Sequence, residues 1–349
     1  MLPWIGENLL ELFGPFRLLT SRMFLIGLST TIGAVLTWYL LPRLWRILPR
    51  DHGRTDAVAA ADSVGKPVGA GIIFTPIYLL TCLLVLPFSA RSLEILGCVL
   101  LLTAEGFMDD RSPGGWSEYR LGLIDLVVSV LGAAALCQLA PVTIWLPILK
   151  TPLVVPTGIY LPAAAALIWL TINATNCTDG VDGLSGSLSA LSLFYLGIIL
   201  YGIVGHAEVA RYLRVPHYPS AVGDAMLGFP MVGCLAGYLW HNAHPSRVLM
   251  GDAGSRPIGF LLGALVLGSG NPVLLLVVAG VVFVNGATGL LKVALKRFFK
   301  VGIFHEIRYP LHDHARQALG WSNTQVLLRF VLLQALGAPL LLLLVMKVR

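Results

Sequence analysis

The chain has 349 residues, of which only 12% are charged, and its mean hydropathy is +0.81. A soluble domain carries about 25% charged residues, so the composition excludes a soluble globular protein. The net charge of +6 does not indicate nucleic acid binding, because Lys and Arg flank apolar runs instead of forming one basic stripe. Five scattered cysteines without C-x-x-C spacing predict neither a disulfide framework nor a zinc site.

Apolar runs of bilayer-crossing length recur along most of the chain. They predict one all-α, polytopic integral membrane domain over residues 1–349, with about ten transmembrane helices. The first run follows Arg17 and Arg22 without a cleavage-site pattern, so we expect a retained helix and not a signal peptide. The predicted spans are 23–42, 70–88, 91–106, 121–140, 158–174, 184–204, 222–240, 257–269, 272–295 and 324–346.

Positive residues concentrate in alternate segments between these spans. Segments 43–66 and 296–316 hold five Lys or Arg residues each, whereas the outward loops hold fewer, such as Arg91 and Lys150. The positive-inside rule therefore places the first set in the cytoplasm. With ten spans, both termini are expected to face outward.

Four motifs with acidic or histidine residues lie at the ends of apolar runs. They are GFMDD (106–110), NATNCTDGVDG (173–183), HNAHPSRVLMGDAGS (241–255) and PLHDH (310–314). Carboxylates are costly and rare in a bilayer, and the predicted orientation places all four motifs on the cytoplasmic side. This clustering indicates a divalent cation and a phosphate-bearing substrate at the membrane surface.

In the first motif, Asp109 and Asp110 are adjacent, so their side chains cannot share one helix face. At a helix end they can point to different partners, for example a metal and an acceptor phosphate. Two neighbouring carboxylates repel each other, which raises one pKa unless a cation compensates. The alternative is a solvated acidic pair before Arg111.

In the second motif, Asp179 and Asp182 are three residues apart and can lie on one face of a helical turn. Asn173 and Asn176 supply neutral donors and acceptors suited to a nucleotide base or sugar. Two asparagines and two aspartates beside an apolar helix are hard to explain by packing alone.

In the third motif, Asp252 lies between glycines, an arrangement that suits a hard oxygen ligand on a tight turn. Gly254 and Ser255 begin the next helix, whose N-terminus favours an anion. With Arg256, these groups suit a magnesium–pyrophosphate assembly. The G-D-x-G-S string alone is also compatible with an ordinary turn.

In the fourth motif, His312 and His314 bracket Asp313. Histidine pairs can bind zinc, but magnesium prefers oxygen ligands, so the motif favours phosphate contact or positioning over metal ligation. Arg308 and Arg316 add phosphate-binding charge. The alternative is a pair of interfacial histidines with only structural partners.

In this order the motifs resemble the polyprenyl-phosphate N-acetylhexosamine-1-phosphate transferase superfamily, and within it the phospho-N-acetylmuramoyl-pentapeptide transferases. The likeness spans nearly the whole chain and includes FGPFRLLTSRMF near the N-terminus, GKPVGAG at 65–71 and LGWSNTQVLLRF after PLHDH. It implies ten transmembrane helices in the bacterial inner membrane and a magnesium-dependent cytoplasmic site. It also implies transfer of phospho-N-acetylmuramoyl-pentapeptide from its UDP donor to undecaprenyl phosphate, giving lipid I and UMP for peptidoglycan synthesis.

The resemblance also implies roles for individual residues. Asp109 and Asp110 match the paired aspartates of the family, and Asp252 matches its magnesium ligand. The candidate catalytic residues are Asp109, Asp110, Asp252, His312 and His314. The candidate substrate-binding residues are Lys66, Asn173, Asn176, Asp179, Asp182, Asn242, Leu249 and Asp313.

Three positions depart from the family pattern. Asp313 interrupts the histidine triplet, and the lysine expected before the glycine motif falls on Ser63, with Lys66 close by. Leu249 stands where the family has an aromatic residue that stacks on uracil. Because GDAGSRPIGF is also more similar to the hexosamine-specific branches, a donor carrying another N-acetylhexosamine-1-phosphate is the alternative.

Two further classes compete with an active transferase. An ion-coupled secondary transporter would carry acids near the midplane of broken helices, often in repeated halves. Here the acids lie at helix ends without a visible repeat, which favours an enzyme; an inactive paralogue acting as a scaffold is the third class. The expected partners are a UDP-sugar, undecaprenyl phosphate and membrane lipid, and a homodimer is left open. Two mechanisms also stay open: direct attack by the lipid phosphate after Asp109 deprotonates it, or a covalent intermediate formed on an aspartate.

Overall fold

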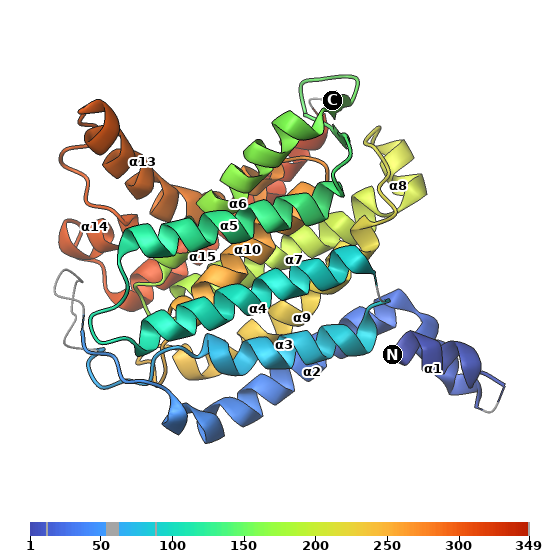
Figure 1. Cartoon of the computed structure of the whole chain (residues 1–349), viewed down its shortest axis with the longest axis horizontal. Helices are drawn as coiled ribbons and strands as arrows, with labels where there is room; N and C mark the ends of the chain where they lie inside the picture. Colours follow the sequence, from blue (N-terminus) through green and yellow to red (C-terminus); the bar gives the residue numbers. More distant parts are fainter. Residues whose placement is uncertain (12, 54–62, 88, 348–349) are drawn as a thin grey trace.

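The computed structural model describes residues 1–11, 13–53, 63–87 and 89–347. Its helices pack into one bundle, and the axes of the long helices are roughly aligned (Figure 1). The helices are α1 (Leu2–Asn8), α2 (Arg22–Leu44), α3 (Gly71–Val85), α4 (Ala90–Arg111), α5 (Glu118–Cys137), α6 (Thr157–Thr178), α7 (Leu184–Ile198), α8 (Ala207–Tyr212), α9 (Ala221–Asn242), α10 (Asp252–Gly268), α11 (Leu274–Val278), α12 (Gly280–Val282), α13 (Thr288–Ala294), α14 (Leu311–Gln317) and α15 (Asn323–Lys347).

Several connections have structure of their own. Two 3₁₀ turns flank α2, at Gly14–Thr20 and Trp45–Ile47, and π-helical turns occupy Ile199–Val204, Phe283–Ala287 and Leu295–Phe299. Between α5 and α6 lies a small antiparallel hairpin of β1 (Val142–Ile144) and β2 (Leu153–Val155), in which Val142 pairs with Val155. The sequence patterns did not predict this hairpin.

The centre of the bundle is α10, which packs against α4, α6 and α7. Every residue of α10 from Asp252 to Leu267 is buried. A helix that is apolar on all sides is either a core helix or faces lipid, and its burial identifies α10 as the core. The predicted span began at 257, but α10 begins five residues earlier because Arg256 is buried with partners inside the protein.

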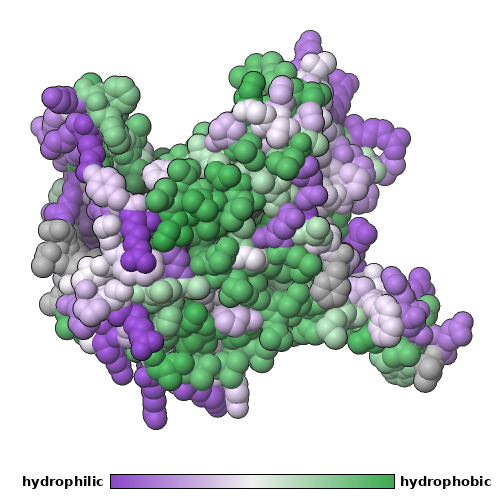
Figure 2. Space-filling model, in the orientation of Figure 1, coloured by the Kyte–Doolittle hydropathy of each residue, from purple (hydrophilic) through white to green (hydrophobic). Residues whose placement is uncertain are grey.

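The outer surface shows how the bundle meets a membrane. A broad hydrophobic band covers the face formed by α3, α4 and α5, and hydrophilic residues gather toward the ends of the molecule (Figure 2). Large apolar side chains are exposed on this face, including Leu100, Leu123 and Val127. Apolar exposure on this scale marks contact with lipid.

The all-α membrane fold is confirmed, but the count of ten spans is not. Within the described ranges, six helical segments are long and apolar enough to cross a bilayer: Arg22–Ile47, Glu118–Cys137, Thr157–Thr178, Leu184–Val204, Ala221–Asn242 and Asn323–Lys347. Helix α3 has 15 residues and α10 has 17, and α4 carries charges near both ends. The run predicted at 272–295 is broken into α11, α12, a π-helical turn and α13.

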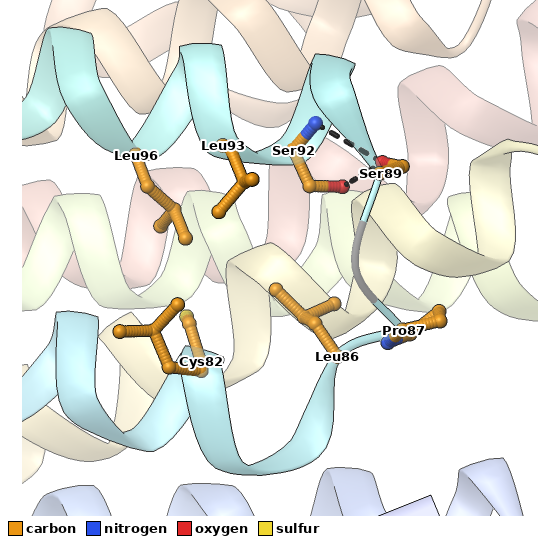
Figure 3. Close-up of a pocket in the computed structure, with 8 residues that line it drawn as sticks. Cys82, Leu86, Pro87, Ser89, Ser92, Leu93 and Leu96 are labelled. Carbon is orange, nitrogen blue, oxygen red and sulfur yellow. Dashed lines mark hydrogen bonds between the residues drawn. The ribbon is translucent and has the colours of Figure 1, made fainter. Parts of the chain in front are cut away.

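The joint between α3 and α4 is tightly packed. Ser89 caps α4: its hydroxyl accepts from the backbone N–H of Ser92 at 3.2 Å and donates to the Ser92 hydroxyl at 2.8 Å (Figure 3). The space between Cys82, Leu86 and Leu96 holds a cavity of only about 10 Å³. This is hardly room for one water molecule, so the joint is a packing contact.

Candidate active site

Three carboxylates meet where the end of α4 reaches the start of α10. Asp109, Asp110 and Asp252 each offer a carboxylate oxygen, and these oxygens lie within 4.8 Å of one another. Asp110 accepts from the backbone N–H groups of Asp252 at 2.9 Å and Ala253 at 3.0 Å, and so caps the N-terminus of α10. Asp109 accepts from the backbone N–H of Trp116 at 2.5 Å. The two adjacent aspartates therefore accept from different backbone groups, although both belong to the same carboxylate cluster.

Glycines allow the three chain segments to come this close. A Cβ at Gly106 of α4 or at Gly71 of α3 would collide with the backbone of Asp252 or Ala253. Gly251 has φ of 69°, a left-handed conformation that favours glycine. The GKPVGAG motif is thus explained by close packing against the start of α10.

The carboxylate of Asp252 accepts one bond from the second motif and one from its own helix. Asn176 donates to its Oδ1 at 2.9 Å, and the Nε of Arg256 donates to its Oδ2 at 2.8 Å. Arg256 also bonds to Oδ2 of Asp125 at 2.5 Å, and Asn173 donates to the same Asp125 oxygen at 3.4 Å. Asn176 therefore holds Asp252 directly, whereas Asn173 bonds to Asp125, which is linked to Asp252 through Arg256.

The cluster and its surroundings hold more carboxyl groups than basic groups. Glu105 lies one helical turn before Asp109, and both its carboxylate oxygens are buried without a hydrogen-bond partner in the described ranges. It interacts electrostatically with Asp125, Asp252 and Arg256. The acids gathered around Arg256 are Glu105, Asp109, Asp110, Asp125 and Asp252.

The loop between α6 and α7 forms the next part of the site. Oδ2 of Asp182 accepts from the backbone N–H of Ser246 at 3.0 Å and lies 2.9 Å from Nδ1 of His244. Lys66 donates to the Ser246 hydroxyl at 3.0 Å. Burial alone would raise the pKa of Asp182, but the bonds from Ser246 and His244 and the charge of Lys66 lower it. Asp182 is therefore ionised at neutral pH.

Asn242, a candidate substrate-binding residue, organises this loop. Asn242 accepts from the backbone N–H of Gly183 and donates to the carbonyl of Val248, both at 2.8 Å, so it joins the second and third motifs. Asp179 is the half-buried residue that ends α6, and it does not share a helical turn with Asp182. Direct contact of Asn242 or Asp179 with a nucleotide stays a prediction.

Leu249 lies beside the carboxylate cluster. Its backbone N–H donates to the carbonyl of Pro67 at 2.8 Å, and its carbonyl accepts from Ala70 at 3.1 Å. The side chain is half-buried. A larger side chain at this position would project from a backbone that is fixed at both ends.

The fourth motif forms α14 and packs on the second. A Cβ at Gly180 would collide with the ring of His312. Asn285 accepts from the backbone N–H of His312 at 2.9 Å and donates to the Thr178 hydroxyl at 3.2 Å, which links α14 to the end of α6. Burial and the nearby charge of Arg316 lower the pKa of His312 to about 3, so its ring is neutral at physiological pH.

The neighbouring carboxylate of Asp313 is balanced by two arginines. Arg308 Nε lies 3.9 Å and Arg316 NH1 lies 3.7 Å from its oxygens. Burial raises the pKa of Asp313, and both arginines oppose that shift. His314 accepts from the backbone N–H of Arg308 at 3.4 Å and is only half-buried.

All four motifs therefore meet around the last turns of α6. Besides Glu105, the buried residues of this assembly that the sequence patterns missed include Asp125 and Asn285. Each is a polar residue inside a predicted apolar span, and polar residues in such spans are a signal of function. That signal was present in the sequence at both positions.

Comparison with known proteins agrees with this assembly. Residues 92–270, which include the first three motifs, match the family described as glycosyl transferase family 4. A phospho-N-acetylmuramoyl-pentapeptide-transferase of Treponema pallidum (strain Nichols) is 46% identical over 93% of this chain and 90% of the relative. The chain belongs to this transferase family.

More distant members cover similar lengths. The enzyme of the same name from Nautilia profundicola is 32% identical over 81% of this chain and 82% of the relative. That of Opitutus terrae is 31% identical over 98% of both chains. The family membership identifies the chain as a phosphoglycosyl transferase integral to a bacterial membrane.

Proposed function

We propose that this transferase moves phospho-N-acetylmuramoyl-pentapeptide from its UDP donor to undecaprenyl phosphate, forming lipid I and releasing UMP. The observation that carries the proposal is the carboxylate cluster of Asp109, Asp110 and Asp252 at the N-terminus of a buried helix. The relatives that share this chain's length all carry the name of that activity.

The cluster fits a bound magnesium ion. Magnesium prefers oxygen ligands, and the three aspartates offer oxygens within 4.8 Å of one another. The buried oxygens of Glu105, which have no hydrogen-bond partner in the described ranges, leave negative charge that a cation would offset. Magnesium held there would neutralise the donor pyrophosphate and favour displacement at phosphorus.

The protein's own groups position the reactants. In the proposed reaction an oxygen of the lipid phosphate attacks the β-phosphorus of the donor, the bond from that phosphorus to the bridging oxygen breaks, and UMP leaves. Asp110 fixes the start of α10 relative to α4, and Asn176 and Arg256 fix the Asp252 carboxylate. Little covalent chemistry is required, so geometry and charge carry the rate.

We further propose that the site faces the cytoplasm and that both termini face outward. The described parts of the Lys- and Arg-rich segments, residues 43–53, 63–66 and 296–316, lie toward the end of the bundle that carries the four motifs. The N and C marks lie toward the right of Figure 1, away from α14. Labelling of single cysteines introduced at the exposed positions Tyr212 and Leu319 with an impermeant reagent tests this assignment; labelling from outside is expected only at position 212.

A donor panel tests the reaction itself. Purified protein, undecaprenyl phosphate and magnesium are incubated with UDP-N-acetylmuramoyl-pentapeptide or with UDP-N-acetylglucosamine, and UMP release is measured. We expect UMP only with the pentapeptide donor. UMP from UDP-N-acetylglucosamine alone would reassign the donor, and no UMP with either, in a preparation that binds the pentapeptide donor, would contradict the proposed reaction.

A further inference from the structure

A side chain of α15 is inserted into the helix break between α11 and α12. Gln334 is 2% exposed and has the only polar side chain within residues 330–346. Its Oε1 accepts from the backbone N–H of Val281 at 3.0 Å, and its Nε2 donates to the carbonyl of Val278 and lies 3.5 Å from that of Val277. In a continuous helix the N–H of Val281 would donate to the carbonyl of Val277, so the Gln334 amide takes the place of this bond.

The helical hydrogen bonds continue on both sides of the inserted amide. The N–H of Ala279 donates to the carbonyl of Leu275 at 2.9 Å, and the N–H of Phe283 donates to the carbonyl of Ala279 at 3.0 Å. Ala279 itself, with φ of −130° and ψ of 24°, is not helical. A side chain inserted into the helical ladder is one of the few causes of a sharp kink, and backbone groups freed inside a membrane protein need partners. Gln334 therefore opens the helix and also satisfies the groups that the opening frees.

The chain beyond the break contacts the proposed active site. Asn285 holds the backbone N–H of His312 and the hydroxyl of Thr178. The next residue, Gly286, packs so closely on α6 that a Cβ there would lie 2.3 Å from the carbonyl oxygen of Ala174. Because these contacts leave little tolerance, the direction in which the chain leaves the break decides whether Asn285 reaches both of its partners.

We propose that Gln334 is a positioning residue of the transferase: its amide keeps the helix bent, and the bend sets Asn285 against His312 and the end of α6. The polar contacts of Gln334 are to backbone groups of residues 277–281, so it acts through Asn285 and not on a substrate. The effect on turnover rests on the proposed function, whereas the effect on the bend does not.

Two substitutions separate the bend from ordinary packing. Gln334→Met removes the amide but keeps a flexible side chain of similar size, so the bond from Val281 to Val277 can form and the helix can straighten. Val281→Pro, added to Gln334→Met, removes the N–H and restores a kink without an amide. The control is Gln325→Met on the same helix, where the lost amide accepts only from the backbone N–H of Ser322.

Spin labels report the bend without any substrate. The chain beyond the break forms an arm, residues 288–299, which includes α13 and projects from the bundle (Figure 1). Labels are attached to cysteines introduced at the exposed positions Phe298 on the arm and Trp240 on α9. In this chain the half-buried Cys177 is replaced by alanine, and the other four native cysteines are buried.

The expected displacement is large enough to measure. Phe298 follows the break by about 28 Å of helix, so a change in bend of about 20° displaces it by up to roughly 10 Å. We expect the distance between the labels to shift in Gln334→Met and to return in the double variant. The control should keep the distance of the unmodified protein.

UMP release at saturating substrates measures the consequence for the reaction. Misplacing a group of the active site by about 1 Å can cost about 100-fold, and we expect a loss of this order in Gln334→Met. The double variant should regain most of the turnover. It should nevertheless stay less thermostable than the unmodified protein, because the carbonyl of Val278 loses its donor.

Several results would overturn the proposal. They are an unchanged label distance in Gln334→Met, a shifted distance with full turnover, and a restored distance without restored turnover. If Gln334→Met does not fold, Val281→Pro alone must keep the bend and the turnover of the unmodified protein, and its failure would contradict the proposal. Because the distance is read without substrate, failure of the proposed donor in the UMP assay is distinguishable from failure of this inference.

Discussion

The two ends of the bundle use the same chemical pair in different ways. At the outward end, Arg91 meets one aspartate, Asp224, and the charges cancel. At the end with the four motifs, Arg256 bonds to both Asp125 and Asp252, and further acids lie close by. Buried charges are tolerated only when they are compensated, and the second end gathers more carboxylates around its arginine than the first, which is why we propose a cation there.

This contrast distinguishes acids that hold other protein groups in place from acids that are positioned to act in the proposed reaction. Asp125 lies inside a predicted apolar span, is completely buried and bonds to Arg256. Asp252 lies at a helix N-terminus beside two other carboxylates. Substitutions at Asp252 and Asp125 test whether the surplus of carboxylates at this end is needed for the proposed transfer reaction.

The largest effect is expected at Asp252. Asp252→Asn removes one charged ligand while keeping the shape of the side chain, and we expect activity to fall by about a thousandfold or more. The corresponding change Asp224→Asn at the outward end should cost far less. UMP release by both variants, with Glu208→Gln as an exposed control, measures the difference; full activity in EDTA would refute the metal assignment.

The second largest effect is expected at Asp125, which bonds to Arg256 beside the carboxylate cluster. Asp125→Asn keeps a hydrogen-bond acceptor for Arg256 but removes a charge, so Arg256 is drawn more strongly to Asp252 and competes with a cation there. Changes around metal ligands typically cost about 10–100-fold in metal affinity. Magnesium titrations of UMP release should show this shift with little change in maximal rate; an unchanged magnesium requirement would leave Asp125 with a packing role.

Sequence alone predicted the membrane class and the grouping of the four motifs, because hydrophobic length and charge placement depend on local composition. It could not predict which acids share a cation. The pairing of Asp110 with the start of α10 and of Arg256 with Asp125 depends on contacts between residues more than 100 positions apart. The broken run at 272–295 was also missed, since its apolar composition does not reveal π-helical turns.

His312, at the end with the motifs, should make stability depend on pH. The pKa of His312 falls to about 3 in the folded protein, whereas an unfolded histidine titrates near 6.5. Above pH 6.5 the ring is neutral in both the folded and the unfolded protein, so the full stability is present. As pH falls from 6.5 toward 3, only the unfolded chain takes up the proton, and the free energy of unfolding decreases by about 1.4 kcal/mol per pH unit.

Thermal inactivation in detergent at pH 7.5 and pH 5 measures this loss. The unmodified protein should lose stability between the two values, and His312→Asn should lose less, although it is less stable at pH 7.5. His217→Asn, an exposed histidine at the outward end, serves as the control. The same pH sensitivity in both variants would rule out His312 as its source.

A smaller effect is expected at Asp182. Asp182→Ala removes the acceptor that holds His244 and Ser246, so the loop on the proposed donor side loses its position. We expect the Kd of the UDP donor to rise by about tenfold, the value of one or two charge-assisted hydrogen bonds. Calorimetric titration with the donor and with undecaprenyl phosphate tests whether Asp182 acts on the donor side. Weaker lipid binding with unchanged donor binding would place it on the lipid side instead.

The smallest effects concern the positions that depart from the family pattern. Asp313 already has Arg308 and Arg316 beside it, so its charge is balanced locally, unlike that of the carboxylate cluster. Asp313→His should therefore change the affinity for a uridine-type nucleoside inhibitor by less than about threefold. Leu249→Phe should strengthen it by roughly threefold, because an aromatic ring on that fixed backbone can stack on uracil. Inhibitor titrations of both variants decide this order, and a larger gain from Asp313→His would mean that the two arginines do not neutralise it.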